Sequence, residues 1–520
     1  MKDLLMGLDL GSTSIKAVIY DLRGNPAAEA STKLPLTFSD KDHPTWCVWL
    51  PEDVWRCAKT VISEALQKLS GDGKLRAIAV TGFGMDGLPL DRDGKELYPL
   101  ISWHCPRTVE QFENVKSIIS HEEIFMETMK RPMVIDSIYR ILWMKQHEPG
   151  ILERADKWLL IEDYVNYKLC GVQATDYSMA STVSAMRQDT HDWSDAVLSK
   201  LGIPRGLLPK PMQAGTVLGT VLPSVCEETG LDGDVKIVLG GHDYICAAFA
   251  TGILSENDMM DINGTWEMLV GGVPKISKTV WTEDYYYIEG HVAKNSYCSI
   301  ASCISGDMME WMKDNFGDMR GGSDGKDKSG TNAAIWDGLM AKAERMEIGA
   351  HGCTFLPHFS GSNAPRVEPT SLGAFVGMNN RVTVGDIIRA VVEGLSYKTR
   401  EMLNSICAST GADITALKAV GGATKNQFWM QVKSDILGIP VETPSMYEAT
   451  PLGAALLAGI GAGVYSDDAD AIQSVYKAGG VYEPDMKKHE RYSDLYENIY
   501  MKMQSSLTEV NGEIFERFVR

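Results

Sequence analysis

The sequence predicts an α/β protein of two domains, and three observations lead to that prediction. Apolar strands alternate with helical segments along the chain, which is typical of α/β folds. The 520 residues exceed the size at which one hydrophobic core keeps growing, so two domains are expected. A pattern of strand, aspartate, small polar turn and second strand occurs at residues 6–19 and again at 259–270. We therefore divide the chain into domains 1–250 and 251–520.

The individual elements follow from local patterns. Residues 4–30 alternate between apolar and polar side chains and predict a β-meander. Pro51 suits the first turn of a helix whose apolar residues recur at helical spacing. Further strands are predicted at 77–82, 235–241 and 416–420, and helices at 51–70, over most of 107–170, at 427–437 and at 451–464. Residues 316–332 are rich in glycine and charge and predict a surface loop.

Composition excludes several classes of partner. A net charge of −19 argues against nucleic acids and anionic membranes. The most apolar late stretch, 451–464, is too short to span a bilayer, and its glycines and alanines indicate a helix packed closely on a sheet. The ten cysteines form no C-x-x-C pair and no histidine cluster has metal-ligand spacing, so we expect reduced thiols in a cytoplasmic protein. We also expect no signal peptide, because no basic region precedes a long apolar run.

The first hairpin has the composition of a phosphate clamp. The turn after Asp9 consists of Gly11, Ser12 and Thr13, whose small side chains let backbone N–H groups approach an anion. Asp9 can hold a hydrated divalent cation, and Lys16 can neutralise phosphate. The alternative is an ordinary hairpin with a polar turn.

Two strand ends carry further candidates. Asp243 follows the glycine-rich end of a strand, where α/β folds place reactive groups, and could take a proton from a substrate hydroxyl that attacks phosphorus. A helix N-cap is the alternative for Asp243. Gly421 and Gly422 lie between a strand and a helix, where a flat ligand or a phosphate could lie against the backbone. Taken alone, these glycines are better explained by a tight turn that needs positive φ.

Polar residues after the strand at 77–82 suit a polyhydroxy ligand. The segment Met85-Asp86-Gly87 is followed by Trp103 and Arg107. A carboxylate accepts from hydroxyls, an indole stacks on C–H faces and a guanidinium donates. Asp176 is a further candidate. For each residue a salt bridge or a helix cap is the alternative.

Four features follow one another along the chain: the phosphate hairpin, the strand-end aspartate, the second hairpin and the paired glycines before a helix. Their order resembles that of the FGGY carbohydrate kinases of the actin-like ATPase superfamily. The segment 137–147 resembles the first family signature, with Arg140 where lysine is usual. Residues 373–378, with Asp386, Ile387 and 390–393, fit the second signature. The resemblance runs from about residue 4 to residue 500. It implies two ribonuclease H-like domains that close on a cleft, with sugar mostly on the first and ATP mostly on the second.

The resemblance also implies roles for individual residues. Asp9 and Asp243 would hold Mg²⁺, with Asp243 also the general base. Gly11, Ser12, Thr13 and Lys16 would lie near the transferred phosphate. Nucleotide contacts would come from Gly264, Thr265, Gly306, Glu310, Gly422 and Asn426, and sugar contacts from Met85, Asp86, Trp103, Arg107, Asp176 and Tyr244. Members often form homodimers, although one chain gives no interface.

Three positions depart from the family pattern. Many members have Met-His-Gly or Arg-Glu where Met85-Asp86-Gly87 stands, and Trp-x-Asp-x-Arg where Cys105 replaces the aspartate. Tyr244 stands where glutamine or asparagine often follows the catalytic aspartate.

We expect a cytoplasmic ATP- and Mg²⁺-dependent kinase that acts on a primary hydroxyl of a small sugar or polyol. The alternatives are a kinase of a polyol-like signal, as autoinducer kinases are, and a nucleotide-gated regulatory protein; an inactive paralogue is disfavoured by the intact aspartates.

Overall fold

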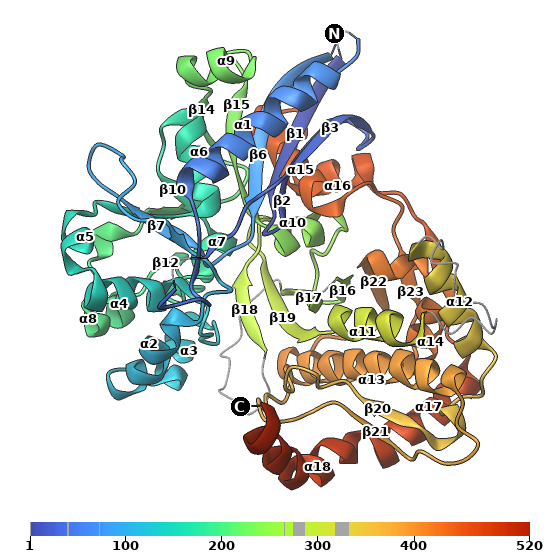
Figure 1. The fold of residues 1–520 in the computed structure, drawn as a ribbon. Coiled ribbons are helices and arrows are strands. Elements are labelled where there is room, and N and C mark those ends of the chain that lie inside the picture. The colour runs from blue at the N-terminus through green and yellow to red at the C-terminus, as the bar shows by residue number, and fades with distance from the viewer. Residues whose placement is uncertain are drawn as a thin grey trace.

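The computed structural model describes residues 2–38, 41–71, 73–264, 266–273, 286–317 and 332–519. Most of the predicted loop at 316–332 lies outside these residues, as does Thr265. Two mixed β-sheets, flanked by helices, organise the chain and lie side by side in Figure 1. The predicted α/β class is therefore confirmed.

The first sheet is built around the N-terminal meander. It has the order β14-β15-β6-β1-β2-β3, in which β6 runs parallel to both β1 and β15. The strands are β1 (Lys2–Leu10), β2 (Ser14–Asp21), β3 (Pro26–Lys33), β6 (Gly73–Gly82), β14 (Val217–Thr220) and β15 (Lys236–His242). The helices of this half are α1 (Pro51–Lys68), α2 (Val109–Asn114), α3 (His121–Thr128), α4 (Ser137–His147), α5 (Pro149–Arg154), α6 (Ile161–Cys170), α7 (Tyr177–Ser181), α8 (Asp195–Leu201), α9 (Pro223–Thr229) and α10 (Asp243–Ala250).

The second sheet repeats this plan. Its order is β18-β19-β17-β16-β22-β23-β24, with β16 (Asp258–Asn263), β17 (Trp266–Val273), β18 (Tyr287–Gly290), β19 (Tyr297–Ile304), β22 (Ala416–Gly421), β23 (Val441–Thr443) and β24 (Gly480–Tyr482). In both sheets an antiparallel meander is followed by two parallel strands, so the internal repeat predicted from the sequence is present in the topology. The helices here are α11 (Gly306–Phe316), α12 (Asn332–Glu344), α13 (Val384–Thr410), α14 (Gln427–Leu437), α15 (Ala449–Ala462), α16 (Asp468–Val475), α17 (Met486–Leu495) and α18 (Met501–Ile514).

Short strands complete the two halves. They are β4 (Thr37–Phe38), β5 (Cys47–Trp49), β7 (Gly87–Leu90), β8 (Leu100–Ile101), β9 (Lys157–Leu160), β10 (Ala174–Asp176), β11 (Met186–Arg187), β12 (Asp192–Trp193), β13 (Lys210–Met212), β20 (Thr354–Leu356) and β21 (Ala374–Val376). Strand β9 interrupts the stretch 107–170, which is otherwise mostly helical as predicted.

Helix α15 belongs to the second half of the sequence but packs on strands of the first sheet. It contacts β1, β6 and β15 and runs beside α10. At Gly453 a Cβ atom would come within 1.9 Å of the Cys246 carbonyl oxygen, so the two helices approach more closely than any other residue allows. The close packing predicted for 451–464 is confirmed, and the core of α10 and α15 joins the two sheets.

Candidate active site

The first hairpin brings Asp9 and Lys16 opposite each other. They are register partners on β1 and β2, and the turn closes through a hydrogen bond from Gly11 N to Ser14 O at 3.0 Å. Lys16 Nζ pairs with Glu448 Oε1 at 2.9 Å, but both side chains are partly exposed. Because such exposed pairs contribute little, Lys16 can exchange this partner for a phosphate. The turn itself, with Ser12 and Thr13, faces solvent.

Asp9 is held beside other carboxylates. Burial, together with the charges of Asp243 and Glu448, raises the pKa of Asp9 to about 8, and Lys16 only partly opposes this. Asp9 on β1 and Gly241 on β15 are both register partners of Thr81 on β6, so Asp9 and Asp243 lie at the same end of the sheet. Carboxylate oxygens at one sheet edge suit a hard cation such as Mg²⁺.

Asp243 is the first residue of α10, directly after β15. Its Oδ1 atom accepts hydrogen bonds from Tyr244 N at 2.6 Å and from His242 Nδ1 at 2.7 Å. Its side chain is 34% exposed, and Oδ2 has no protein partner within the described part of the chain. One carboxylate oxygen is thus fixed while the other is available to a substrate.

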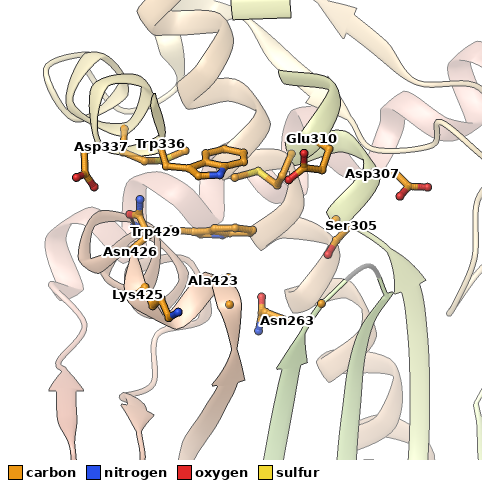
Figure 2. A pocket seen from close by; sticks show the side chains of 15 residues that line it. Asn263, Ser305, Asp307, Glu310, Trp336, Asp337, Ala423, Lys425, Asn426 and Trp429 are labelled. Carbon is orange, nitrogen blue, oxygen red and sulfur yellow. Dashed lines mark hydrogen bonds between the residues drawn. The ribbon is translucent and has the colours of Figure 1, made fainter. Parts of the chain in front are cut away.

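A pocket of about 450 Å³ lies on the second sheet. It is formed where the β16–β17 turn, the start of α11, the helix α12 and the start of α14 meet (Figure 2). The lining includes the predicted residues Gly264, Gly306, Glu310, Gly422 and Asn426, together with Asn263, Ser305, Asp307, Met309, Trp336, Asp337, Met340, Ala423, Lys425 and Trp429. Apart from Thr265, the predicted nucleotide contacts on this sheet therefore come together in one cavity.

Two tryptophans that the sequence analysis did not single out line this pocket. Figure 2 shows the indole rings of Trp336 and Trp429 one above the other, contributed by α12 and α14. The Trp429 side chain is almost fully buried, and its Nε1 donor has no hydrogen-bond partner in the part of the chain that the structure describes. Facing aromatic rings suit a planar base. In the sequence these residues could not be told from core tryptophans on helices.

Gly421 and Gly422, just before α14, differ in their surroundings. Gly421 has φ +99°, and a Cβ there would meet the Asn263 carbonyl oxygen at 2.5 Å, so the turn requires glycine. Gly422 has open space around it and lines the pocket. Asn426 caps the helix, because its Oδ1 accepts from Trp429 N at 2.9 Å.

Asp86, a predicted sugar contact, is fully buried and has its own protein partners. Its Oδ1 accepts from Arg140 Nη2 at 3.1 Å, and its Oδ2 accepts from Trp49 Nε1 at 2.8 Å and Trp103 N at 3.0 Å. Burial raises the pKa of Asp86 to about 6, although Arg140 opposes the shift. Two departures from the family pattern, Asp86 and Arg140, thus pair with each other beneath the loop that carries Met85.

Asp176 and Arg107 also have internal partners. Asp176 is buried and caps α7, accepting from Ser178 N at 2.7 Å and Met179 N at 2.9 Å, which is the alternative that the sequence left open. Arg107 lies over the rings of Trp46 and Trp143, 4.6 and 5.0 Å from their centroids. These arrangements favour supporting roles for both residues.

Tyr244 is tied to the second sheet. Its hydroxyl donates to Glu289 Oε2 at 2.5 Å, and Glu289 Oε1 pairs with Lys130 Nζ at 3.0 Å. All of these groups are buried, so the network links the residue after Asp243 to β18. Sequence analysis missed Glu289 and Lys130, because nothing in their local sequence marks them.

Met85 and Trp103 are the predicted sugar contacts that stay partly exposed. Met85 has φ +75°, an uncommon conformation for a residue other than glycine, and its backbone N donates to Thr182 Oγ1 at 3.0 Å. Strained backbone of this kind is often found at functional sites. The Trp103 ring stacks on His104 at 3.6 Å between centroids. These two side chains are best placed to meet a ligand.

A pocket of about 450 Å³ on the second sheet and a strand-end carboxylate with one unpartnered oxygen among the described residues on the first are the features expected of a phosphotransferase. Comparison with known proteins makes this specific: residues 4–250 match the N-terminal domain, and residues 261–462 the C-terminal domain, of the FGGY family of carbohydrate kinases. The chain belongs to this family and is a carbohydrate kinase, as the sequence predicted.

Individual relatives differ in substrate. L-fuculokinase of Escherichia coli (strain K12) is 28% identical over 487 residues, covering 91% of this chain and 96% of its own. Xylulose kinase of Staphylococcus epidermidis (strain ATCC 12228 / FDA PCI 1200) is 26% identical and covers 98% of each chain. The structure of gluconate kinase from Lactobacillus acidophilus superposes with a TM-score of 0.86 at 24% identity, covering 99% of this chain and 100% of that one. The chain is therefore similar in sequence to kinases with different sugar names, and it shares its fold with the solved structure.

The cysteines and the apolar character of the helices were also considered in the sequence analysis. All ten cysteines are free, and only Cys226 and Cys407 are partly exposed. Among the helices that the structure describes, none combines the length and apolar character needed to cross a membrane.

Proposed function

We propose that this chain transfers the γ-phosphoryl group of ATP to a primary hydroxyl of a small sugar or polyol, with a short ketose or sugar alcohol as the acceptor class. The observation that carries the proposal is the carboxylate of Asp243, which has Oδ1 fixed by two protein donors and Oδ2 without a partner among the described residues, at the sheet end where Asp9 also lies. A base in that position can take the proton of an attacking hydroxyl.

Asp9 and Asp243 are the groups that would hold Mg²⁺. Burial, and after it the charges of Asp243 and Glu448, raise the pKa of Asp9, so a cation bound there would stabilise the charged carboxylate. When bound, the cation would neutralise charge on the phosphates. The chain itself would supply further compensation through Lys16 and the backbone N–H groups of Ser12 and Thr13, since the N–H of Gly11 already closes the turn.

In the proposed reaction the acceptor O–H gives its proton to Asp243 Oδ2 as the new O–P bond forms. The bond between the γ-phosphorus and the β,γ-bridging oxygen breaks, and ADP leaves. We assign the first domain, 1–250, to the acceptor and the second, 251–520, mainly to ATP. The pocket lined by Gly264, Gly306 and Gly422 supports the second assignment, with Trp336 and Trp429 on either side of the base.

Fewer residues are proposed to contact the acceptor directly than the sequence suggested. Met85 and Trp103 are our proposed contacts. The other four candidates are buried, and we assign them supporting roles: Asp86, Arg107, Asp176 and Tyr244. The departures at Asp86 and Tyr244 then act on the shape of the acceptor site through Arg140 and Glu289 rather than through bonds to the sugar.

Acceptor profiling tests this function. ATP turnover with Mg²⁺ is measured over ketoses, aldoses, polyols and sugar acids, with a control that lacks acceptor, and ³¹P NMR locates the new phosphate ester. Strong stimulation by one ketose or polyol and a primary phosphate ester are expected. Phosphorylation of a secondary hydroxyl would contradict the proposal. Slow hydrolysis that no acceptor in the panel stimulates would also contradict it, and would favour a polyol-like signal as acceptor or a regulatory role.

A further inference from the structure

His242 lies between the proposed base and the loop that carries Met85. It is the last residue of β15 and is only 3% exposed. The ring packs on Tyr244, with centroids 4.0 Å apart, and lies against Gly84. A Cβ on Gly84 would come within 2.6 Å of His242 Nε2, so the ring fits only because residue 84 is glycine.

The hydrogen bonds of His242 define its tautomer. Gly84 N donates to Nε2 at 3.2 Å, so Nε2 is an acceptor and carries no hydrogen. The neutral ring then has its hydrogen on Nδ1, which lies 2.7 Å from Asp243 Oδ1 and donates to it. The imidazole therefore connects the backbone of the Met85 loop directly to the carboxylate of the base.

This connection fixes which oxygen of Asp243 can act. Oδ1 receives two donors, His242 Nδ1 at 2.7 Å and Tyr244 N at 2.6 Å, and together they restrict the orientation of the carboxylate. Without the imidazole donor, a side chain that is one-third exposed could rotate about its own bonds. Rotation would bring the free oxygen out of line with the acceptor.

We propose that His242 is a positioning residue for the kinase reaction. It holds Asp243 Oδ2 towards the acceptor hydroxyl and keeps the base in register with the acceptor loop through Gly84. His242 exchanges no proton with substrate; the proton of the acceptor hydroxyl ends on Asp243. The proposal rests on the function proposed above, with Asp243 as general base.

Two isosteric substitutions separate the two hydrogen bonds. In His242→Asn the amide NH₂ can occupy the place of Nδ1 and donate to Asp243, while the bond from Gly84 is lost. In His242→Gln the longer amide can reach the place of Nε2 and keep the bond from Gly84, while the donor to Asp243 is lost. Both variants replace the imidazole by an amide, and they differ in whether a donor to Asp243 remains.

Steady-state kinetics with ATP and the best acceptor give the test. We expect His242→Gln to lower kcat about 10- to 100-fold, since small misplacements of reacting groups have effects of this size, with both KM values within about threefold of wild type. We expect His242→Asn to keep kcat within about fivefold. Equal losses in both variants, or an unchanged kcat in His242→Gln, would overturn the proposal.

A double variant shows whether His242 acts through Asp243. In the Asp243→Asn background, His242→Gln should change the residual rate by less than about threefold, because the group it orients is gone. Independent, multiplying losses would overturn the positioning role. Wild-type-like activity of Asp243→Asn alone would instead overturn the proposed base, so failure of one inference is distinguishable from failure of the other.

Discussion

Among the substitutions considered, loss of the Lys433 charge has the largest predicted effect on the stability of the fold. This residue of α14 is fully buried, and its Nζ donates to Asp261 Oδ2 at 2.5 Å, Asn263 Oδ1 at 2.9 Å and Glu267 Oε1 at 3.0 Å. Burial alone would lower the pKa of Lys433, but the Asp261 and Glu267 carboxylates outweigh it and raise the pKa. One cation thus ties the helix of the nucleotide pocket to both strands of the second hairpin.

Replacement of Lys433 by methionine keeps most of the side-chain volume and removes the charge. Asp261 and Glu267 are then left as two buried carboxylates without a cation, which should cost about 3–5 kcal/mol. For a domain of this size that loss corresponds to a fall in Tm of roughly 6–20 °C. Lys488 provides the matched control: it pairs with Asp435 at 3.6 Å and is 47% exposed, so Lys488→Met should cost at most about 1 kcal/mol.

Calorimetric melting of wild type and both variants at several pH values gives the measurement. Burial already raises the pKa of Glu267, and removal of Lys433 raises it further, so the folded variant takes up a proton as the pH falls. The penalty for Lys433→Met should therefore be larger at pH 8 than at pH 5. Adding Glu267→Gln should recover part of the lost stability. A Tm equal to that of Lys488→Met, or a penalty that grows as the pH falls, would refute this reasoning.

Three further predictions concern the site. Trp429→Ala should raise the KM for ATP about 5- to 150-fold, since base stacking on an aromatic ring contributes about 1–3 kcal/mol, and leave the acceptor KM unchanged in initial-rate kinetics. Gly421→Ala should weaken binding of an ATP analogue in calorimetric titration, because φ +99° and the Asn263 carbonyl oxygen oppose a Cβ; unchanged affinity would contradict this. Asp9→Asn should raise Tm in metal-free buffer above pH 8, because the wild-type carboxylate, with its pKa of about 8, is charged there in the folded state. The gain in Tm should vanish towards pH 4. At that pH Asp9 is protonated in the folded state and increasingly so in the unfolded state. A gain independent of pH in melting curves would contradict that origin.

Local sequence was sufficient for the features whose geometry is local. The hairpin after Asp9, its repeat at 259–270 and the strand that ends before Asp243 follow from alternation and turn residues within a short window. The same holds for the tight turn at Gly421, which has positive φ, whereas the nucleotide contact of Gly422, which lines the pocket, stays a prediction.

The roles of buried polar residues could not be predicted in this way. Asp86 was chosen as a sugar contact, yet its partner Arg140 lies far along the chain, and only the fold brings the two together. The hydroxyl of Tyr244 donates a hydrogen bond to Glu289 from the other sheet, and this contact too depends on the fold. Whether a carboxylate faces substrate or supports a loop depends on which distant donors reach it, and a single sequence does not contain that information.

The turnover of Asp243→Asn, measured with the best acceptor beside wild type, tests the central claim most directly. The account predicts that kcat falls about 10²- to 10⁴-fold, the range for loss of a general base, while an ATP analogue binds with unchanged affinity. A kcat within about threefold of wild type would contradict the account, because the hydroxyl would then lose its proton to some other group.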